Sequence, residues 1–277
     1  MDRGNDDGLA SDVAEAPSNA PDDRGTGPLK RDLVAGLEKG LTVIEAFDQE
    51  RPRLTISEVA ERTGLTRAAA RRYLITLAHL GFVSQDRKMF ALTPRVLRLA
   101  QSYMHSARLP RIVQPELHKL AHELKEASAA GVLDGDDVIS IAANSAGRLV
   151  SLTLQAGTRV PAYCTSNGRV LLASLDAHAL EDRIAPQRLR SLTPHTIVQP
   201  DLLRAELARV RTQGYAVVDQ ELEINLRTVA VPLRNYRGET VAALNVSVHA
   251  TRMTVSQLVQ TALPPLLQAQ AQLRQLL

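Results

Sequence analysis

Hydrophobic residues are distributed very differently in the first 29 residues and in the rest of the chain. Residues 1–29 show almost no periodic apolar pattern, so this segment cannot repay the entropy that a chain loses when it becomes ordered. Further on, Leu37, Leu41, Ile44 and Phe47 follow at intervals of four, three and three residues, which is one face of an amphipathic helix. The pattern therefore predicts a disordered tail over residues 1–29 and a folded unit that begins with a helix.

Two further helices separated by a short break follow in this unit. Ser57 is placed to cap a short helix over Ser57–Arg62, and Gly64 follows it as a helix breaker. Thr66 then precedes a longer helix over Arg67–Leu80, which has apolar residues recurring along one side. A short helix, a tight turn and a longer helix in this order predict a helix-turn-helix.

A two-stranded ribbon completes the predicted N-terminal unit. Residues 82–83 and 90–92 are apolar and prone to form strands, and they flank a polar turn over residues 84–88. A ribbon in this position is the wing of a winged helix. We therefore predict a winged helix-turn-helix DNA-binding domain over residues 30–92.

A connecting helix follows, which begins at Thr93-Pro94 and continues to about Ser106. Its apolar stripe of Val96, Ala100 and Tyr103 has no partner within the small N-terminal unit. We predict a linker and dimerisation helix over residues 93–109.

The remaining residues, 110–277, mix helical and strand patterns. Together with the N-terminal unit they predict the α+β fold class and an effector-binding domain over residues 110–277. Helices are predicted over residues 111–127, 165–175 and 201–213 and from about Thr254, where Pro264-Pro265 is expected to kink the last one. Strands are predicted over residues 131–133, 138–142, 149–154, 215–218, 228–233 and 241–248.

Charge and composition exclude several classes of protein. The 277 residues carry a net charge of +3, and residues 1–29 hold seven acidic residues and two Arg, so the rest of the chain is distinctly basic. One cysteine, Cys164, excludes an intramolecular disulfide and suits a reducing compartment. No segment resembles a signal peptide or a membrane span, so we expect a cytoplasmic protein without a membrane partner. With 3% aromatic residues, stacking platforms for single-stranded nucleic acid are not expected.

The basic residues are concentrated in the predicted winged helix. Between Thr66 and Arg98 there are seven Lys or Arg and one acidic residue, Asp86. Basic residues on one helix are often only a solvated face, but here they coincide with the order of elements that inserts a recognition helix into the major groove. Arginine can bridge a guanine edge with two hydrogen bonds, and basic residues in the wing suit phosphates or the minor groove. The candidate DNA-binding residues are Thr66, Arg67, Ala68, Arg71, Arg72, Arg87 and Lys88.

A possible acid-binding segment lies at the predicted helix start near residue 165. Free N–H groups at a helix N-terminus beside Ser166, Asn167 and Gly168 form a receptor for a carboxylate, although the same residues also serve ordinary helix capping. Cys164 precedes this helix and could be a nucleophile with His249 or Asp219, but no hydrolase motif surrounds it and a packing role is favoured.

Metal binding and catalysis find little support in the sequence. His118 and His122 lie one helical turn apart but have no third ligand, so a solvated pair is favoured. We expect no catalytic residue, no metal and no cofactor.

Five ordered segments carry a resemblance to a known family. The chain resembles the IclR family of bacterial transcriptional regulators over about residues 31–277, and within it the branch that controls protocatechuate and 4-hydroxybenzoate catabolism. The segments are GLEKGLTVIEAFD, LTISEVAERTGLTRAAARRYLITLAHLGFV, MFALTPRVLRLAQSY, GTRVPAYCTSNGRVLLASL and GYAVVDQELEINLRTVAVPLRNYRGETVAALNVSVHATRMT.

The resemblance implies an N-terminal winged helix-turn-helix, a linker helix used in dimerisation, and a C-terminal α/β effector domain of GAF-like type with a curved antiparallel sheet. It also implies that the effector pocket is lined by Ser166, Asn167, Val218, Thr228, Asn245 and Ser247. The carboxylate usual in the family at Val218 is absent, and Thr228 replaces a smaller residue. An apolar Val beside hydroxyl and amide groups suits an aromatic ring with a carboxylate at one end.

The function that follows is a ligand-responsive regulator of aromatic-acid catabolism genes, for which the resemblance favours activation. Its expected partners are an imperfectly palindromic DNA operator, a small aromatic or dicarboxylic acid, a second copy of the chain with a possible dimer of dimers, and RNA polymerase if it activates. One alternative is a repressor of the same family that senses a different small organic acid. The other is an enzyme with a DNA-binding module, which would need an activated nucleophile or a metal.

Overall fold

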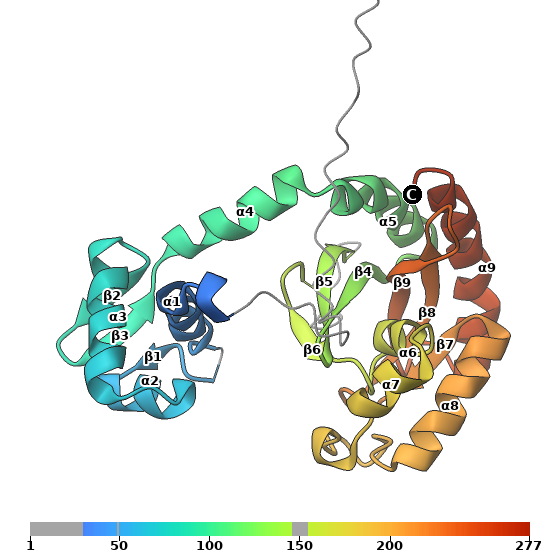
Figure 1. The fold of residues 1–277 in the computed structure, drawn as a ribbon. Coiled ribbons are helices and arrows are strands. Elements are labelled where there is room, and N and C mark those ends of the chain that lie inside the picture. The colour runs from blue at the N-terminus through green and yellow to red at the C-terminus, as the bar shows by residue number, and fades with distance from the viewer. Residues whose placement is uncertain (1–29, 49, 146–154) are drawn as a thin grey trace, which may run out of the picture.

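The computed structural model describes residues 30–48, 50–145 and 155–277, which form two units joined by one helix (Figure 1). The predicted disordered tail and the predicted strand over residues 149–154 lie outside the described residues. Within the described ranges, no helix is long and apolar enough to cross a membrane.

The N-terminal unit combines three helices with a small antiparallel sheet of order β1-β3-β2, in which β2 and β3 form the predicted ribbon and β1 is a third strand that was not predicted. A short 3₁₀ turn, Lys30–Asp32, precedes it. The elements are α1 (Ala35–Glu45), β1 (Arg53–Leu54), α2 (Ile56–Thr63), α3 (Arg67–His79), β2 (Val83–Asp86) and β3 (Met89–Leu92).

Side-chain caps determine where α2 and α3 begin. Thr55, not the predicted Ser57, caps α2: the Thr55 side chain accepts from the Glu58 N–H at 3.3 Å, and the Glu58 carboxylate accepts from the Thr55 N–H at 2.7 Å. This capping box satisfies two N–H groups at once, so helix α2 starts one residue earlier than predicted. Gly64 ends α2 with a φ of +67°, and Thr66 caps α3 by accepting from the Ala69 N–H.

The predicted apolar face of α1 is buried only in its second half. Leu37 and Leu41 are 64% and 46% exposed, whereas Val43 of the same helix is fully buried. Ile44 and Phe47 of the predicted stripe are partly buried against the core of the unit, in which Val59 and Leu74 are buried. The first half of the stripe, Leu37 and Leu41, consequently has no cover within the described chain.

Helix α4 (Leu97–Ser106) connects the two units, after a 3₁₀ turn over Pro94–Val96 that Thr93 caps (Figure 1). It contains no buried residue among those described. Helix α5 (Arg108–Leu124) follows at once and is the first element of the C-terminal unit, where its apolar side packs on the sheet.

The C-terminal unit is built on a six-stranded antiparallel sheet of order β6-β5-β4-β9-β8-β7. The curved antiparallel sheet that the family resemblance implies is thus confirmed. Its strands are β4 (Ala127–Asp134), β5 (Asp137–Asn144), β6 (Arg159–Pro161), β7 (Ala216–Asp219), β8 (Leu226–Arg234) and β9 (Thr240–His249).

Alternating side chains bury both faces of this sheet. Val229 and Val231 face the core under α5 and α9, while Ala230 between them faces the core under α6 and α8. The helices are α6 (Ser166–Leu172), α7 (Ala177–Arg183), a 3₁₀ turn over Pro186–Arg188, α8 (Pro200–Gln213) and α9 (Val255–Arg274). Helix α7 was not predicted, and α9 runs through Pro264-Pro265 as one helix.

Candidate DNA interface and ligand cavity

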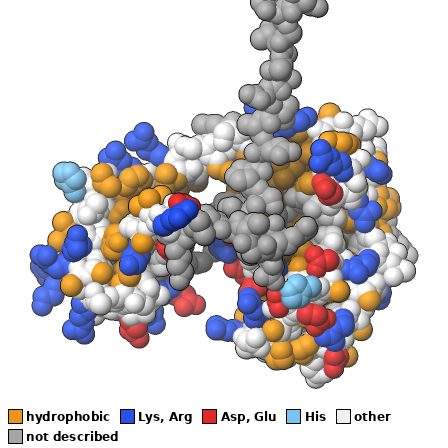
Figure 2. Space-filling view, in the orientation of Figure 1, with side chains coloured by type: hydrophobic (Ala, Val, Ile, Leu, Met, Phe, Trp, Pro, Cys, Tyr) orange, Lys and Arg blue, Asp and Glu red, His pale blue; other side chains and the backbone are white. Residues whose placement is uncertain are grey.

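The seven predicted DNA-binding residues are all exposed, and they lie on two adjoining elements. Thr66 caps α3, and Arg67, Ala68, Arg71 and Arg72 occupy its first two turns. The remaining two, Arg87 and Lys88, form the turn between β2 and β3. Figure 2 shows Lys and Arg side chains gathered on the outer side of this unit.

Neighbouring basic residues are already paired, whereas those at the predicted interface are not. Arg62 pairs with Asp48, and Arg53 pairs with Asp86, the one acidic residue of the segment, at 3.8 Å. Arg95 lies over the ring of Phe82. No ion pair within the described ranges involves the five basic residues of the predicted interface, so their charge is available to phosphates and base edges.

Arg87 occupies a backbone position that favours glycine. Its φ is +53°, in the left-handed region that non-glycine residues adopt at a cost in free energy. The chain therefore places a cation at the tip of the wing where glycine would be less strained. This placement is consistent with a role of the side chain outside the fold.

The C-terminal unit encloses a cavity between α6 and the sheet. Five of the predicted effector residues lie together in its wall: Ser166 and Asn167 on α6, Val218 on β7, Thr228 on β8 and Asn245 on β9. The rest of the wall is mostly apolar and consists of Ala129, Val138, Ser140, Val160, Cys164, Thr165, Leu222 and Leu226.

Two predicted effector residues lie outside the wall. A Cβ atom on Gly168 would sit 2.0 Å from the carbonyl oxygen of Ala162, so glycine is needed for close packing of α6 on that backbone. The Gly168 N–H donates to the Thr165 hydroxyl at 3.1 Å. Ser247 is fully buried and accepts from the Asn245 side chain at 3.0 Å, so it supports a wall residue from behind.

Four polar atoms of the wall are buried without a hydrogen-bond partner in the described chain. They are the hydroxyl oxygens of Ser140, Ser166 and Thr228 and the side-chain oxygen of Asn167. An unsatisfied buried polar group costs about 1–3 kcal/mol, so four of them around one cavity indicate a binding site for a polar ligand. Ser140 is the member that sequence analysis missed, although it is the one polar side chain among Val138, Ile139 and Ile141 of β5.

Cys164 is fully buried beside the cavity. Burial and the nearby Glu221 carboxylate raise the pKa of its thiol to about 12, so it is protonated at neutral pH and is a poor nucleophile. The two groups considered as its partners are engaged elsewhere, because Asp219 pairs with Arg227 at 2.8 Å and His249 contacts Thr251 at 2.8 Å. Cys164 therefore packs rather than reacts.

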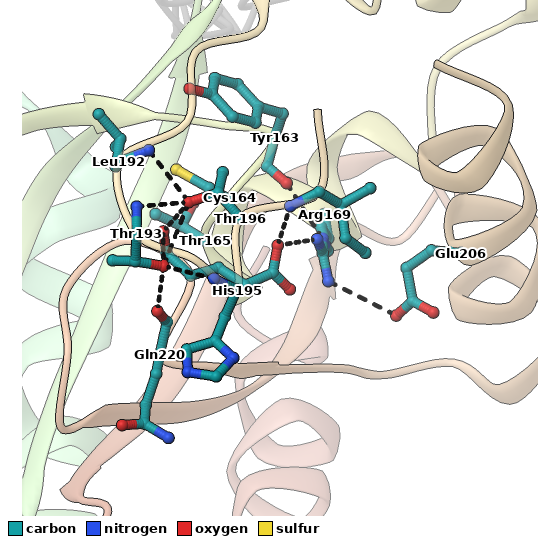
Figure 3. Close-up of polar contacts among 12 residues, drawn as sticks. Tyr163, Cys164, Thr165, Arg169, Leu192, Thr193, His195, Thr196, Glu206 and Gln220 are labelled. Atoms are coloured by element: carbon teal, nitrogen blue, oxygen red, sulfur yellow. Dashed lines mark hydrogen bonds and ion pairs between the residues drawn. The ribbon is translucent and has the colours of Figure 1, made fainter. Parts of the chain in front are cut away.

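A buried ion pair behind the cavity was not predicted. Arg169 of α6 is 1% exposed, and its guanidinium donates to the Glu221 carboxylate at 2.6 Å and to the Tyr163 carbonyl oxygen at 3.0 Å. Glu206 of α8 lies 3.8 Å from the same guanidinium. Figure 3 shows Tyr163 and Glu206 beside Arg169, with a dashed line from the Glu206 carboxylate to the guanidinium. The pair joins residues 52 positions apart, which no local pattern reveals.

The segment that carries Glu221 is held by a second set of hydrogen bonds. The Thr193 hydroxyl donates to the Gln220 carbonyl oxygen and the Thr196 hydroxyl to that of Glu221, each at 2.7 Å (Figure 3). The Glu221 carboxylate also accepts from the Ile197 N–H at 3.0 Å. Because Leu222 follows directly and lines the cavity, this network positions part of the wall.

The fold and these two surfaces define a DNA-binding regulator: a winged helix-turn-helix with a basic recognition helix, joined to a separate ligand-binding unit. The sequence model of the IclR helix-turn-helix domain matches residues 36–87, and that of the bacterial transcriptional regulator IclR C-terminal domain matches residues 101–274. The chain belongs to the IclR family of transcriptional regulators.

Three relatives characterise its place in this family. It is 43% identical over 239 residues to the Pca regulon regulatory protein of Pseudomonas putida, which is 86% of this chain and 82% of that protein. It is 39% identical over 250 residues to the p-hydroxybenzoate hydroxylase transcriptional activator of Acinetobacter baylyi. The matched residues are 88% of this chain and 92% of that protein. The crystal structure of a double mutant of the PobR inducer-binding domain from Acinetobacter with 3-hydroxybenzoic acid is 32% identical, has a TM-score of 0.59, and covers 62% of this chain and 100% of that one.

Removing the acidic partner of Arg169 tests the importance of the buried pair. We expect Glu221→Ala to lower the free energy of unfolding by about 3–5 kcal/mol, because the buried Arg169 loses its hydrogen-bonded carboxylate and keeps only Glu206, at 3.8 Å. Urea unfolding followed by circular dichroism measures this loss. The matched control is Glu181→Ala, whose partner Arg204 is exposed, and it should leave stability nearly unchanged. Equal effects of the two substitutions would contradict a structural role of the pair.

Proposed function

We propose that this protein regulates genes of aromatic-acid catabolism, as an activator, and that a small aromatic acid bound in the C-terminal cavity controls it. The observation that carries the proposal is the set of four unpartnered polar atoms in one apolar-lined cavity. The names of the relatives support the aromatic class of ligand and, for one of them, activation. Such a regulator acts in the cytoplasm, where its DNA is.

The cavity suits an aromatic carboxylic acid in its chemistry. Hydroxyl groups such as those of Ser166 and Thr228 can donate to a carboxylate, and the apolar wall, which includes Val218 and Leu222, accommodates a ring. No acidic side chain lines the cavity in the described chain, so a bound carboxylate meets no like charge there. The protein in this role binds its effector stoichiometrically without turnover.

DNA binding rests on the exposed basic surface of the N-terminal unit. Helix α3 enters the major groove, where Arg67 and Arg71, one turn apart, reach base edges. Arg87 and Lys88 at the wing tip contact phosphates or the minor groove. Because a single recognition helix reads only a few base pairs, the operator contains two half-sites.

Exposed apolar side chains support a docking surface for a second copy of the chain. Leu97, Leu99 and Tyr103 of α4 are 62%, 50% and 47% exposed, and Leu37 and Leu41 of α1 are also uncovered. Exposed apolar residues gathered on a linker helix and on the adjacent unit favour association. A homodimer buries them and presents two recognition helices to an imperfectly palindromic operator.

Two substitutions separate base reading from phosphate binding. Arg71→Ala should weaken operator binding by on the order of 1–3 kcal/mol and relax base preference. Lys88→Ala should weaken binding to all sequences alike and reduce the slope of log affinity against log salt by about one unit. Fluorescence anisotropy with operator and scrambled duplexes at several salt concentrations measures both effects. The same uniform loss in both variants would exclude direct base reading by Arg71.

Filling or charging the cavity tests its role as the effector site. Ser166→Leu should abolish the response to effector by filling the site, and Val218→Asp should weaken acid binding more than about tenfold through charge repulsion in a partly desolvated site. Calorimetric titration with 4-hydroxybenzoate, protocatechuate and β-ketoadipate, paired with a promoter reporter, measures binding and response. DNA binding without effector is the control for folding. If both variants bind and respond like the wild type, the effector site lies elsewhere.

The oligomeric state tests the proposed role of α4. Sedimentation analysis should show at least a dimer both in solution and on DNA. Footprinting of the operator should show two protected half-sites roughly 10 base pairs apart or a multiple of this spacing. Replacing Leu97 and Leu99 together by Ser should shift the equilibrium toward monomer, because both apolar side chains are exposed in one chain. A monomer both free and on DNA would refute this arrangement.

A further inference from the structure

The unpartnered polar atoms are spread widely over the wall of the cavity. Ser140 lies on β5 and Thr228 on β8, with β4 and β9 between them in the sheet. Neighbouring strands are about 4.8 Å apart, so three strand spacings, roughly 14 Å along the curved sheet, separate the backbones of the two residues. The register also aligns Ser140 with Pro232 of β8, which lies four residues along that strand from Thr228. One carboxylate cannot contact both, and a single ligand that satisfies both must therefore carry two polar groups.

Asn167 adds a specific chemical requirement near the β5 side. Its amide nitrogen donates to the Asn245 side-chain oxygen at 3.4 Å, and the Asn245 nitrogen donates in turn to Ser247 at 3.0 Å. These bonds leave the Asn167 oxygen as the atom without a partner, in a residue that is 8% exposed. A carbonyl oxygen accepts hydrogen bonds and cannot donate them, so the missing partner is an O–H or N–H group.

Gly131 brings Asn167 close to the strand pair that carries Ser140. Its Cα is paired with that of Ser140 across β4 and β5, and a Cβ atom on Gly131 would lie 3.2 Å from the Asn167 amide nitrogen. The Asn167 side chain therefore lies against Gly131, the residue that pairs with Ser140. Both residues line the cavity and are at least nine-tenths buried.

We propose that Ser140 and Asn167 form a subsite for a hydroxyl group of the effector, and that this subsite makes the cavity select a hydroxylated aromatic monocarboxylic acid over a dicarboxylic acid. The effector hydroxyl donates to the Asn167 oxygen and accepts from the Ser140 hydroxyl, which satisfies both atoms. A second carboxylate has no proton to donate, and it meets the Asn167 oxygen with repulsion. Thr228, on the far side of the cavity, is left for the acid group of the ligand.

This inference rests on the proposed function, because it assumes that the cavity is the effector site. The test is calorimetric titration of the full-length protein with 3- and 4-hydroxybenzoate, benzoate, 4-methoxybenzoate and benzene-1,4-dicarboxylate. We expect the preferred hydroxybenzoate to bind about ten- to hundredfold more tightly than benzoate, which corresponds to two hydrogen bonds, and at least threefold more tightly than 4-methoxybenzoate, which cannot donate to the Asn167 oxygen. Binding of the dicarboxylate should be the weakest of the series.

Ser140→Ala removes one hydroxyl group and leaves the apolar wall in place. It should weaken the preferred hydroxybenzoate about three- to tenfold and benzoate less than twofold, so that the preference for a hydroxyl group falls to what the Asn167 oxygen alone supplies. Ser84→Ala in strand β2 is the matched control, because Ser84 lies in the other unit and outside the cavity. Thermal melting and operator binding of each variant establish that it is folded.

Each result has a separate meaning. Equal affinity of the wild type for benzoate and both hydroxybenzoates, or an equal loss for all ligands in Ser140→Ala, would overturn the subsite while leaving the effector cavity intact. Tighter binding of the dicarboxylate would also overturn it, since that result requires the Asn167 amide to present its nitrogen to the ligand. Failure of every acid to bind the wild type would instead refute the proposed function on which the subsite rests.

Discussion

The arrangement of the C-terminal unit depends on the buried charge of Arg169. A guanidinium removed from water must be surrounded by acceptors, and here Glu221, Glu206 and the Tyr163 carbonyl oxygen supply them. Because Arg169 belongs to α6, these contacts hold that helix over the sheet, with Ser166 and Asn167 at its start facing the cavity. The polar face of the cavity is thus positioned by a charge that does not itself line it.

The two units differ in where they keep polar groups without a partner. In the C-terminal unit these groups are buried, and in the N-terminal unit they are exposed. In the wall of the cavity, four buried polar atoms have no hydrogen-bond partner among the described residues, which lowers the stability of the fold in favour of a binding site. In the N-terminal unit, the cations of α3 and the wing stay exposed, and Arg87 adopts a strained backbone conformation. Both are local departures from the most stable arrangement, and departures of this kind are expected where a protein binds something.

Helix α4 lies between the DNA-binding unit and the ligand-binding unit, and none of its described residues is buried. Helix α4 carries exposed Leu97, Leu99 and Tyr103 and is followed directly by α5, which packs on the sheet of the effector unit. If a second copy covers α4, this helix fixes the distance between the two recognition helices of the dimer. A conformational change in the effector unit then reaches the DNA-binding unit through α4. The physical requirement is a ligand that binds one arrangement of the dimer more tightly than another.

Local pattern in the sequence determined the helix-turn-helix, the wing, the basic recognition helix and most strands of the sheet, because caps, glycine breaks and apolar periodicity act over a few residues. Five of the six residues assigned to the effector site through the family resemblance lie together in the cavity wall. Tertiary structure alone decided the rest. The face that α1 buries, the close contact at Gly168, the pairing of Arg169 with Glu221 and the position of Ser140 opposite Gly131 all depend on residues far apart in the chain. Each of these contacts occurs once, where two elements pack together. It therefore produces no repeating pattern of residue types that a sequence could reveal.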